Sequence, residues 1–496
     1  MNPLFILSAS AEVSPYSKSG GLGDVAAALP KHLAKLGHRI VSVTPFYGFM
    51  KNAEIPYDQP GIEFDVAIGD GTYHLKTKHL KLREGLDIYF ICSEELYGRY
   101  QVYMYGHDND ALRFAVFSMA VVQLAQRLGE PPDVIHCHDW HTAIIPNILR
   151  TREQDNPFFS KTATVVTIHN LLFQMQGNWW QGPSDKVDVG LGPLPKSSAK
   201  IRWVNFAKRG IRYADAINTV SVRYAQEILT PEYGQGLDRL LRRRQKDVFG
   251  IINGIDYQVY NPQFDSHLWH PYDWNSLDRK RQNKGELQKM IGLEPRDDIP
   301  LIGLVHRLTE QKGFDLIKNI LPVLMQLPLQ MVIVGTGDRD YVNIFRRAAR
   351  TYPGRIALLT PFTEELGSRV YAGSDMFLMP SRYEPCGMSQ LISLRYGSIP
   401  IVRKTGGLSD TIEDFDPRTG KGTGFVFSRY ASDDLLVAIV RALETFKYPQ
   451  VWEHLAWQAM QESYSWDIPA EKYVELYRQA MVLQKQRSHE RSDALG

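Results

Sequence analysis

The sequence predicts an α/β protein with two domains, each built on a parallel sheet covered by helices. Its 496 residues exceed what one hydrophobic core normally serves. Short apolar runs alternate with helical segments in both halves, as in chains of βαβ units. The spelling KSGGLGD at 18–24 returns as KTGGLSD at 404–410, each time after an apolar run. We therefore expect two doubly wound, Rossmann-like domains that face each other across a ligand-binding cleft.

The first half contains apolar runs that are typical of buried parallel strands. Between residues 62 and 92 the pattern changes to short alternating runs, which predict hairpins added to the sheet. The predicted parallel strands are 4–8, 40–44, 133–137, 164–168, 216–220 and 248–252.

The alternation of apolar runs and helical segments is interrupted at Asn253-Gly254-Ile255-Asp256 and at Tyr260-Asn261-Pro262, and a polar stretch follows. This segment is the candidate hinge. A second βα series then has strands at 301–305, 331–334, 356–359, 376–379, 399–402 and 424–427. Apolar residues at helical spacing predict closing helices at 433–445, 450–462 and 467–485, with a polar, frayed tail at 486–496.

The glycine-rich turn at 18–24 lies between a predicted strand and a predicted helix. Consecutive glycines let the backbone approach a ligand, and a helix start offers unpaired N–H groups and a positive dipole end. The turn indicates an anion site, or it only tightens a corner. Its echo at 404–410 favours the anion site.

Histidines gather where a strand of the first domain should end, in His136-Cys137-His138-Asp139-Trp140-His141. Alternate strand residues point to opposite faces, so His136 and His138 share a side. Contact with a sugar is favoured over a metal site, because Asp139 suits hydroxyls and Trp140 a ring face. A buried histidine with satisfied hydrogen bonds is the alternative. The same choice applies to His169-Asn170.

Two cations follow a strand of the second domain, Arg307 and Lys312. On one loop at the strand's carboxyl end they could neutralise a pyrophosphate without a metal, although a single Arg or Lys is often a solvated charge. Glu384 precedes the start of a further predicted helix, so it either meets sugar hydroxyls or caps that helix. The run at 242–244 of three arginines predicts a solvated helix face.

Composition narrows the function classes. The chain is 44% hydrophobic and 23% charged with a net charge of +2, which gives no indication of nucleic acid as a partner. No apolar run is long enough to span a membrane, and the start lacks a basic signal-peptide region. Its three cysteines show no metal-ligand or disulfide spacing. We expect a cytoplasmic protein without a membrane partner; no oligomeric state is indicated.

With these motifs in view, the chain closely resembles the bacterial glycogen synthases and plant starch synthases, which are retaining glucosyltransferases of the GT-B fold. The resemblance runs almost end to end. It implies an acceptor-side domain at 1–262, a nucleotide-sugar domain at 263–466 and a helix at 467–485 that packs back on the first domain. The matching segments are 18–24, 136–141, 167–170, 253–256, 307–313, 371–380, 382–390 and 395–410.

The resemblance also implies the reaction and its residues. Glucose passes from ADP-glucose to the non-reducing end of an α-1,4-glucan such as glycogen, a starch-like polymer or a maltooligosaccharide, with retention and without a metal or other cofactor. Arg307 and Lys312 hold the diphosphate, and the 406–407 turn offers backbone donors. The implied catalytic residues are Lys18, His141, His169, Arg307, Lys312 and Glu384. The implied substrate-binding residues are Lys18, Gly20, Gly21, Asp24, Asn170, Tyr383, Cys386, Gly387, Thr405, Gly406 and Gly407.

Three other functions are alternatives to a glycogen or starch synthase. Sucrose- or trehalose-forming GT-B enzymes that use UDP-glucose commonly show a second glutamate eight residues after the first, where this chain has Ile392. A dinucleotide-binding dehydrogenase needs a G-x-G-x-x-G turn, which Gly20-Gly21-Leu22-Gly23 does not give. A non-catalytic glucan-binding scaffold would not need Lys18, Arg307, Lys312 and Glu384 together. Since no carboxylate is suited to attack the anomeric carbon, we expect same-face attack guided by the leaving phosphate.

Overall fold

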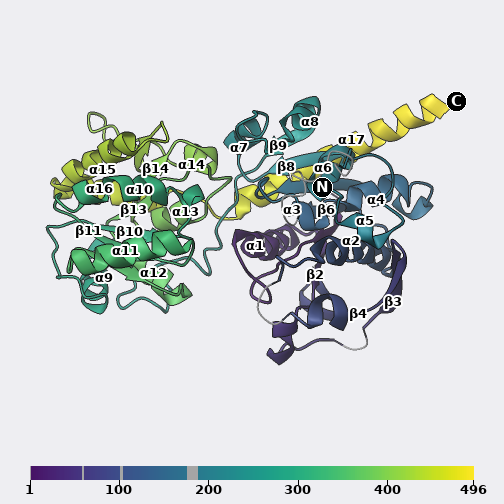
Figure 1. Cartoon of the computed structure of the whole chain (residues 1–496), viewed down its shortest axis with the longest axis horizontal. Coiled ribbons are helices and arrows are strands. Elements are labelled where there is room, and N and C mark those ends of the chain that lie inside the picture. The colour runs from purple at the N-terminus through teal and green to yellow at the C-terminus, as the bar shows by residue number, and fades with distance from the viewer. Residues whose placement is uncertain (1, 59–60, 101–103, 176–187, 496) are drawn as a thin grey trace. The chain divides into compact units, whose positions relative to one another are not determined.

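The computed structural model describes residues 2–58, 61–100, 104–175 and 188–495. The chain divides into two compact units (Figure 1). Unit 1 comprises Met1–Ile252 and Trp466–Gly496, and unit 2 comprises Asn253–Ser465. In the described ranges, no helix combines the length and the apolar character needed to cross a membrane.

Unit 1 is built on a nine-stranded sheet that is parallel except at one edge. There β4 pairs antiparallel with both β3 and β5, which confirms the predicted hairpins. The predicted parallel strands are confirmed too. In sheet order, the strands are β3 (Glu63–Ile68), β4 (Gly71–Arg83), β5 (Leu86–Cys92), β2 (Arg39–Pro45), β1 (Phe5–Ala9), β6 (Val134–His138), β7 (Ala163–Ile168), β8 (Ala216–Thr219) and β9 (Val248–Gly250).

Both faces of this sheet are covered, because successive residues of its central strands are apolar and point to opposite sides. In β1, Phe5 and Leu7 join the larger core with α2, whereas Ile6 joins a second core with α1 and α17. The helices of unit 1 are α1 (Gly21–Lys35), α2 (Asp110–Arg127), α3 (Asp139–Thr142), α4 (Ile145–Thr151), α5 (Ser198–Ile201), α6 (Phe206–Tyr213), α7 (Val222–Glu227), α8 (Asp238–Arg243) and α17 (Asp467–Leu495).

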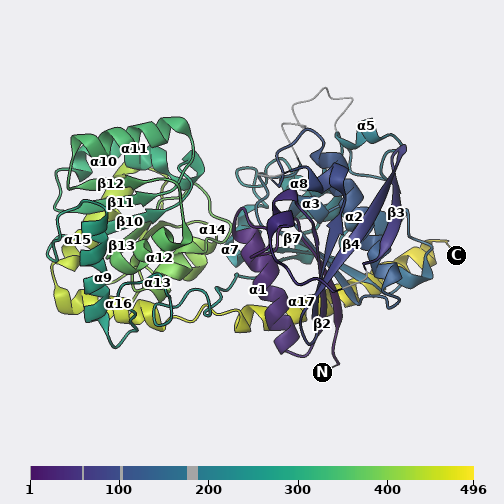
Figure 2. The same cartoon turned by 90° about the horizontal axis from the view of Figure 1, so that it is seen from below.

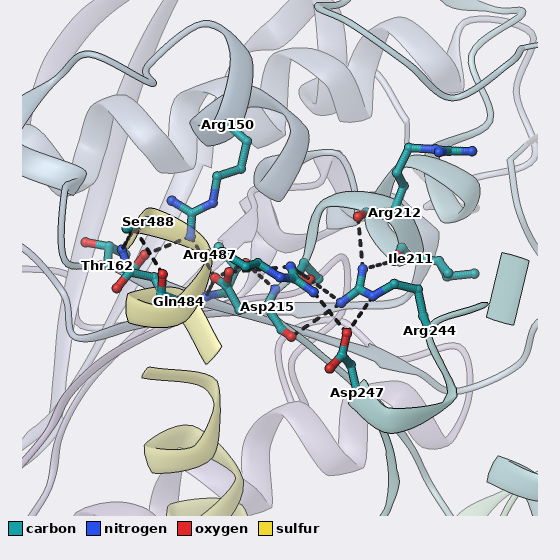
Figure 3. Close-up of polar contacts among 12 residues, drawn as sticks. Arg150, Thr162, Ile211, Arg212, Asp215, Arg244, Asp247, Gln484, Arg487 and Ser488 are labelled. Carbon is teal, nitrogen blue, oxygen red and sulfur yellow. Dashed lines mark hydrogen bonds and ion pairs between the residues drawn. The ribbon is translucent and has the colours of Figure 1, made fainter. Parts of the chain in front are cut away.

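The C-terminal helix is longer than the sequence predicts. Instead of fraying after residue 485, α17 runs to Leu495. Residues near the predicted end bond to other parts of unit 1, since Gln484 Nε2 donates to the Ser160 carbonyl at 2.7 Å and Arg487 donates to the Ala214 carbonyl at 2.6 Å (Figure 3). Arg487 also bonds to Asp247 at 3.0 Å. These contacts stabilise a polar segment that has no apolar stripe of its own.

The prediction of a solvated face at 242–244 is wrong for its last arginine. Arg242 and Arg243 are exposed, but the Arg244 guanidinium donates to the carbonyls of Ile211, Arg212 and Ala214 at 2.6, 2.9 and 2.8 Å (Figure 3). These carbonyls lie at the end of α6, where backbone oxygens lack helical partners. Arg244 also pairs with Asp247 at 2.7 Å, so it closes the end of α6.

Unit 2 is built on a six-stranded, all-parallel sheet with helices on both sides (Figure 2). The predicted strands are again confirmed. In sheet order they are β12 (Ile356–Leu359), β11 (Gln330–Val334), β10 (Leu301–Val305), β13 (Met376–Met379), β14 (Ile399–Arg403) and β15 (Phe425–Phe427). The helices are α9 (Leu277–Met290), α10 (Phe314–Leu324), α11 (Arg339–Thr351), α12 (Glu364–Gly373), α13 (Ser389–Arg395), α14 (Gly406–Thr411), α15 (Ser432–Phe446) and α16 (Pro449–Gln461).

The boundary between the units lies ten residues before the expected position at 262, after Ile252. The residues that follow bond within unit 2. Ile255 N–H donates to the Tyr464 carbonyl at 2.8 Å and Ile255 pairs with Ser465, while Arg395 donates to Asn261 Oδ1 at 3.1 Å. The segment expected to be a hinge is therefore mostly part of unit 2.

Candidate active site

The residues singled out by sequence lie at the carboxyl ends of parallel strands in each unit. In unit 1 they follow β1, β6 and β7, and in unit 2 they follow β10, β13 and β14. This edge is where open parallel sheets bind ligands.

The glycine-rich turn of unit 1 encloses a carboxylate of the protein itself. The N–H groups of Ser19 and Gly20 donate to Glu12 Oε2 at 2.7 and 3.2 Å, and the Tyr105 hydroxyl donates to Glu12 Oε1. Glu12 is buried, and this burial raises its pKa. In this conformation the Gly20 amide therefore already has an anionic partner within the protein.

Lys18 lies on the outer side of the same turn. Its ammonium forms an ion pair with Asp24 Oδ1 at 2.8 Å, and both side chains are partly exposed. Asp24 belongs to the first turn of α1, where a negative charge is favourable. The ion pair fixes Lys18 near the start of the helix while leaving its side chain accessible.

The ends of β6 and β7 are joined by consecutive residues, His138 and Asp139. His138 Nδ1 lies 3.0 Å from His169 Nε2. Asp139 has a φ of 56°, and its Oδ1 accepts from the N–H groups of His169 at 2.8 Å and Asn170 at 3.3 Å. Burial raises the pKa of Asp139 to about 7. His169 and Asn170 are themselves only partly buried, so both can meet a ligand.

His141 is placed differently from His169. Its side chain is 3% exposed and packs among Trp140, Phe114 and Tyr105, with ring centroids 4.0, 4.7 and 4.9 Å away. Neither ring nitrogen has a hydrogen-bond partner among the described residues. Burial lowers the pKa of His141 to about 3, so the ring is neutral. In this conformation His141 therefore has no exposed polar atom.

The predicted common face of His136 and His138 is confirmed, with ring centroids 4.0 Å apart. Their nitrogens bond to protein groups, His136 to Thr167 at 2.7 Å and Tyr477 at 2.9 Å, and His138 to Ser8 at 3.3 Å. In the part of the chain that the structure describes, no group of three or more His, Cys, Asp or Glu residues could hold a metal ion.

In unit 2, Lys312 and Glu384 come together from the loops after β10 and β13. Lys312 Nζ lies 2.5 Å from Glu384 Oε2, which also accepts from the Ser381 hydroxyl at 3.0 Å. Glu384 is 5% exposed. The alternative that Glu384 caps a helix is wrong, since Met388 occupies the N-cap of α13 and no side chain bonds there.

Arg307 lies on the same loop as Lys312 but is exposed. Over the described ranges it forms no hydrogen bond or ion pair with the rest of the chain. The loop after β10 thus carries two cations, Arg307 without a partner in the described chain and Lys312 paired with Glu384.

The second glycine-rich turn packs on the loop that carries Glu384. Gly406 has a φ of 44°, and a Cβ there would lie 1.9 Å from the Glu384 carbonyl oxygen. A Cβ on Gly407 would lie 1.9 Å from the Cys386 carbonyl oxygen. The Gly407 N–H already donates to the carbonyls of Glu384 at 3.1 Å and Pro385 at 3.2 Å. The implied role of Gly407 as a backbone donor to the substrate is therefore not available in this conformation.

The remaining implied contacts surround this turn. Cys386 is buried, and burial raises the pKa of its thiol to about 12, so the thiol is neutral. Gly387 adopts a φ of 71°, and a Cβ there would lie 2.3 Å from Gln390 Oε1. Tyr383 is partly buried, and Thr405 is the N-cap residue of α14.

Sequence reasoning missed Glu12, His138 as a partner of His169, and Phe362. Phe362 is 50% exposed and lies between β12 and α12 at the same strand edge of unit 2. For His138, the signal that could have been used is its alternation with His136 along the strand. No signal marked Glu12, because its partners depend on how the loop after β1 turns back.

Comparisons with known proteins cover nearly the whole chain. Residues 5–243 match a family model described as the starch synthase catalytic domain, and residues 288–455 match glycosyl transferases group 1. A glycogen synthase of Desulforudis audaxviator is 44% identical over 97% of both chains. One of Geotalea daltonii is 42% identical over 97% of this chain and 99% of the relative.

Solved structures also match nearly the whole chain. The catalytic domain of starch synthase IV from Arabidopsis thaliana, bound to ADP and acarbose, matches with a TM-score of 0.85 and 31% identity, covering 97% of this chain and 100% of that one. A sucrose-phosphate synthase from Thermosynechococcus elongatus has a TM-score of 0.60 at 17% identity, over 97% of this chain and 99% of that one, which indicates a shared fold alone.

Proposed function

The chain belongs to the starch and glycogen synthase family of glucosyltransferases with the GT-B fold, and from this premise we propose how its groups act on ADP-glucose. It transfers glucose to an α-1,4-glucan, with retention at the anomeric carbon as in its family.

The observation that carries the proposal is the presence of two cations, Arg307 and Lys312, on the loop that follows β10. As the bond between the sugar and the diphosphate breaks, negative charge builds on ADP, and fixed cations stabilise that charge more than they stabilise the ground state. Lys312 is oriented by its 2.5 Å contact with Glu384, whereas Arg307 has no protein partner in the described chain. Both cations can therefore neutralise a diphosphate without a metal, so we propose that none is required.

Glu384 has a second role in this proposal. The hydrogen bonds from Lys312 and Ser381 both go to its Oε2. The second oxygen of the carboxylate can accept from sugar hydroxyls. We assign Glu384 to binding the hydroxyls of the transferred glucose, beside Tyr383, Cys386 and Gly387. Thr405, Gly406 and Gly407 shape the loop beneath it.

Unit 1 contributes Lys18, His169 and Asn170. Lys18 remains accessible next to the glycine-rich turn, and we assign its ammonium to a phosphate or a hydroxyl of the donor, with Asp24, Gly20 and Gly21 setting its position. His169 and Asn170 are assigned to the sugar. Phe362 in unit 2 offers an exposed ring face on which the base could stack.

Retention without a covalent intermediate is supported by the bonding of the carboxylates. At the described strand ends, Glu12, Asp139 and Glu384 are each buried and bonded to backbone or side-chain donors of the protein. None projects as an unpaired nucleophile. We therefore propose that the acceptor hydroxyl attacks from the side of the departing phosphate, which accepts its proton.

The starch synthase IV structure is bound to ADP and acarbose, which supports a nucleotide and a glucan as the ligands of this chain too. We expect the enzyme to work in the cytoplasm on glycogen, a starch-like polymer or maltooligosaccharides.

The test is to incubate the purified protein with glycogen and either ADP-glucose or UDP-glucose, with and without EDTA. We expect ADP release that matches glucose incorporation, at least about tenfold faster than with UDP-glucose and unchanged by EDTA. Equal rates with the two donors, or loss of activity in EDTA, would contradict the proposed donor or the metal-free mechanism.

A further inference from the structure

We propose that His138 is a positioning residue for glucosyl transfer, which acts by fixing the ring of His169. The inference rests on the proposed contact of His169 with the transferred sugar. His138 itself is buried and touches no substrate in this arrangement.

The contact is a hydrogen bond between two imidazoles, His138 Nδ1 and His169 Nε2, at 3.0 Å. Burial lowers the pKa of His169 to about 3 and that of His138 well below its usual value, so both rings are neutral. In a pair of neutral imidazoles one nitrogen donates and the other accepts. The bond therefore couples the tautomers of the two rings and leaves Nδ1 of His169, which has no partner in the described chain, to meet a ligand.

The ring of His138 is held from its other side as well. Its Nε2 lies 3.3 Å from the Ser8 hydroxyl of β1. The ring packs against His136, which is bonded to Thr167 at 2.7 Å and to Tyr477 of α17 at 2.9 Å. His138 is thus fixed by strands and by α17, and rigid elements position a site more accurately than loops do.

His169 is held twice by neighbouring residues. Asp139 accepts from its backbone N–H at 2.8 Å, and His138 bonds its ring. The first contact fixes where the residue lies, and the second fixes how the ring is rotated about its side-chain bonds. Without the second contact, His169 would be free to turn, and a displacement of about 1 Å at a reacting group can lower a rate 10²-fold.

The alternative is that His138 only fills the core. A packing role and a positioning role predict different responses to two near-isosteric changes. The amide of an asparagine at 138 can take the place of Nδ1 and reach His169, whereas the amide of a glutamine takes the place of Nε2 and reaches Ser8 instead. Only positioning through His169 predicts that the His138→Asn variant is more active than the His138→Gln variant.

The experiment compares His138→Asn, His138→Gln and His138→Phe in the full-length protein, alone and combined with His169→Ala. Cys137→Ala is the matched control, since Cys137 lies in the same strand but packs in the core on the opposite face. Initial rates with ADP-glucose and glycogen give kcat and KM, and thermal unfolding monitors the fold.

We expect His138→Gln and His138→Phe to lower kcat on the order of 10²-fold, with the KM for ADP-glucose within about threefold of wild type. His138→Asn should retain at least about ten times more activity than His138→Gln. In the His169→Ala background each of these substitutions should change kcat by less than about threefold, because the residue through which His138 acts is gone.

Equal losses in the Asn and Gln variants, or the same loss with and without His169, would overturn the positioning role. If one of the three His138 variants fails to fold, the effect of the His169→Ala background is compared for the two variants that do fold. Wild-type rates in His169→Ala alone would instead contradict the proposed contact of His169 with the sugar, which separates failure of the proposed function from failure of this inference.

Discussion

Lys312 Nζ and Glu384 Oε2 lie 2.5 Å apart, although 72 residues separate them in the chain. The ion pair joins the loops after β10 and β13, and Glu384 is buried whereas Lys312 is partly exposed. One contact thus stabilises unit 2 and orients a cation proposed to meet the diphosphate.

Lys312→Ala should destabilise unit 2, whereas Arg307→Ala should not. Removing the ammonium leaves a buried carboxylate with Ser381 as its remaining partner among the described residues, at an expected cost of about 1–3 kcal/mol in the free energy of unfolding. Arg307 is exposed and has no partner in the described chain, so its removal should cost less than about 0.5 kcal/mol. Urea denaturation of both variants measures the difference, and equal destabilisation would show that the ion pair is not what holds Glu384.

Gly407→Ala should displace the Glu384 loop. The added Cβ would lie 1.9 Å from the Cys386 carbonyl oxygen, which cannot move without moving the backbone of that loop. We expect a loss of at least about 2 kcal/mol in stability together with lower activity. Gly285→Ala is the control, because nothing lies within 4 Å of its Cβ and α9 should gain about 0.5–1 kcal/mol. A Gly407→Ala protein as stable as wild type would contradict the close packing.

His141→Phe should keep turnover within a few-fold of wild type and flatten the pH dependence of stability. The folded-state pKa of His141 is about 3, against an ordinary value of 6.5, so only the unfolded chain takes up a proton between these values. Its contribution to stability is present above pH 6.5 and is lost as the pH falls toward 3. In the variant the slope of unfolding free energy over this window should fall by up to about 1.4 kcal/mol per pH unit.

Denaturant titrations at pH 5 and pH 7 measure that slope. His141→Phe also removes two buried ring nitrogens that have no partner in the described chain, so stability at pH 5 should rise. An unchanged slope would contradict the buried, neutral ring. A collapse of kcat with the fold intact would support the catalytic role that the resemblance implies.

Arg244→Met should destabilise unit 1 by about 1–3 kcal/mol, because three carbonyls near the end of α6 and Asp247 lose their common donor. Arg243→Met is the matched control. It removes the same charge from an exposed neighbour and should change stability by less than about 0.5 kcal/mol. Equal effects in thermal unfolding would mean that the bonds drawn in Figure 3 contribute little.

The strands and the two parallel sheets were predictable because apolar runs such as 301–305 and 376–379 are buried on both faces and carry their own signal. The helical end of α17 was not predictable from the sequence. The residues after 485 are polar, and their helical state depends on bonds from Arg487 to groups far away in the chain.

The two glycine-rich turns show where motif reading stops. Their spelling is nearly the same, yet the first wraps around Glu12 and the second packs on the backbone of Glu384 and Cys386. Which group a turn approaches is decided by residues that are distant in sequence. The same limit explains why Arg244 and Arg243, alike and adjacent in the chain, differ in burial.

The most direct test of the central claim, that Arg307 and Lys312 stabilise the leaving diphosphate, is the initial rate of ADP release from ADP-glucose with glycogen as acceptor. Arg418→Ala serves as the control, since it removes an arginine whose side chain is 88% exposed. We expect Arg307→Ala and Lys312→Ala each to lower kcat on the order of 10²–10³-fold, and Arg418→Ala to leave it unchanged. Near-wild-type kcat in both folded variants would contradict the claim.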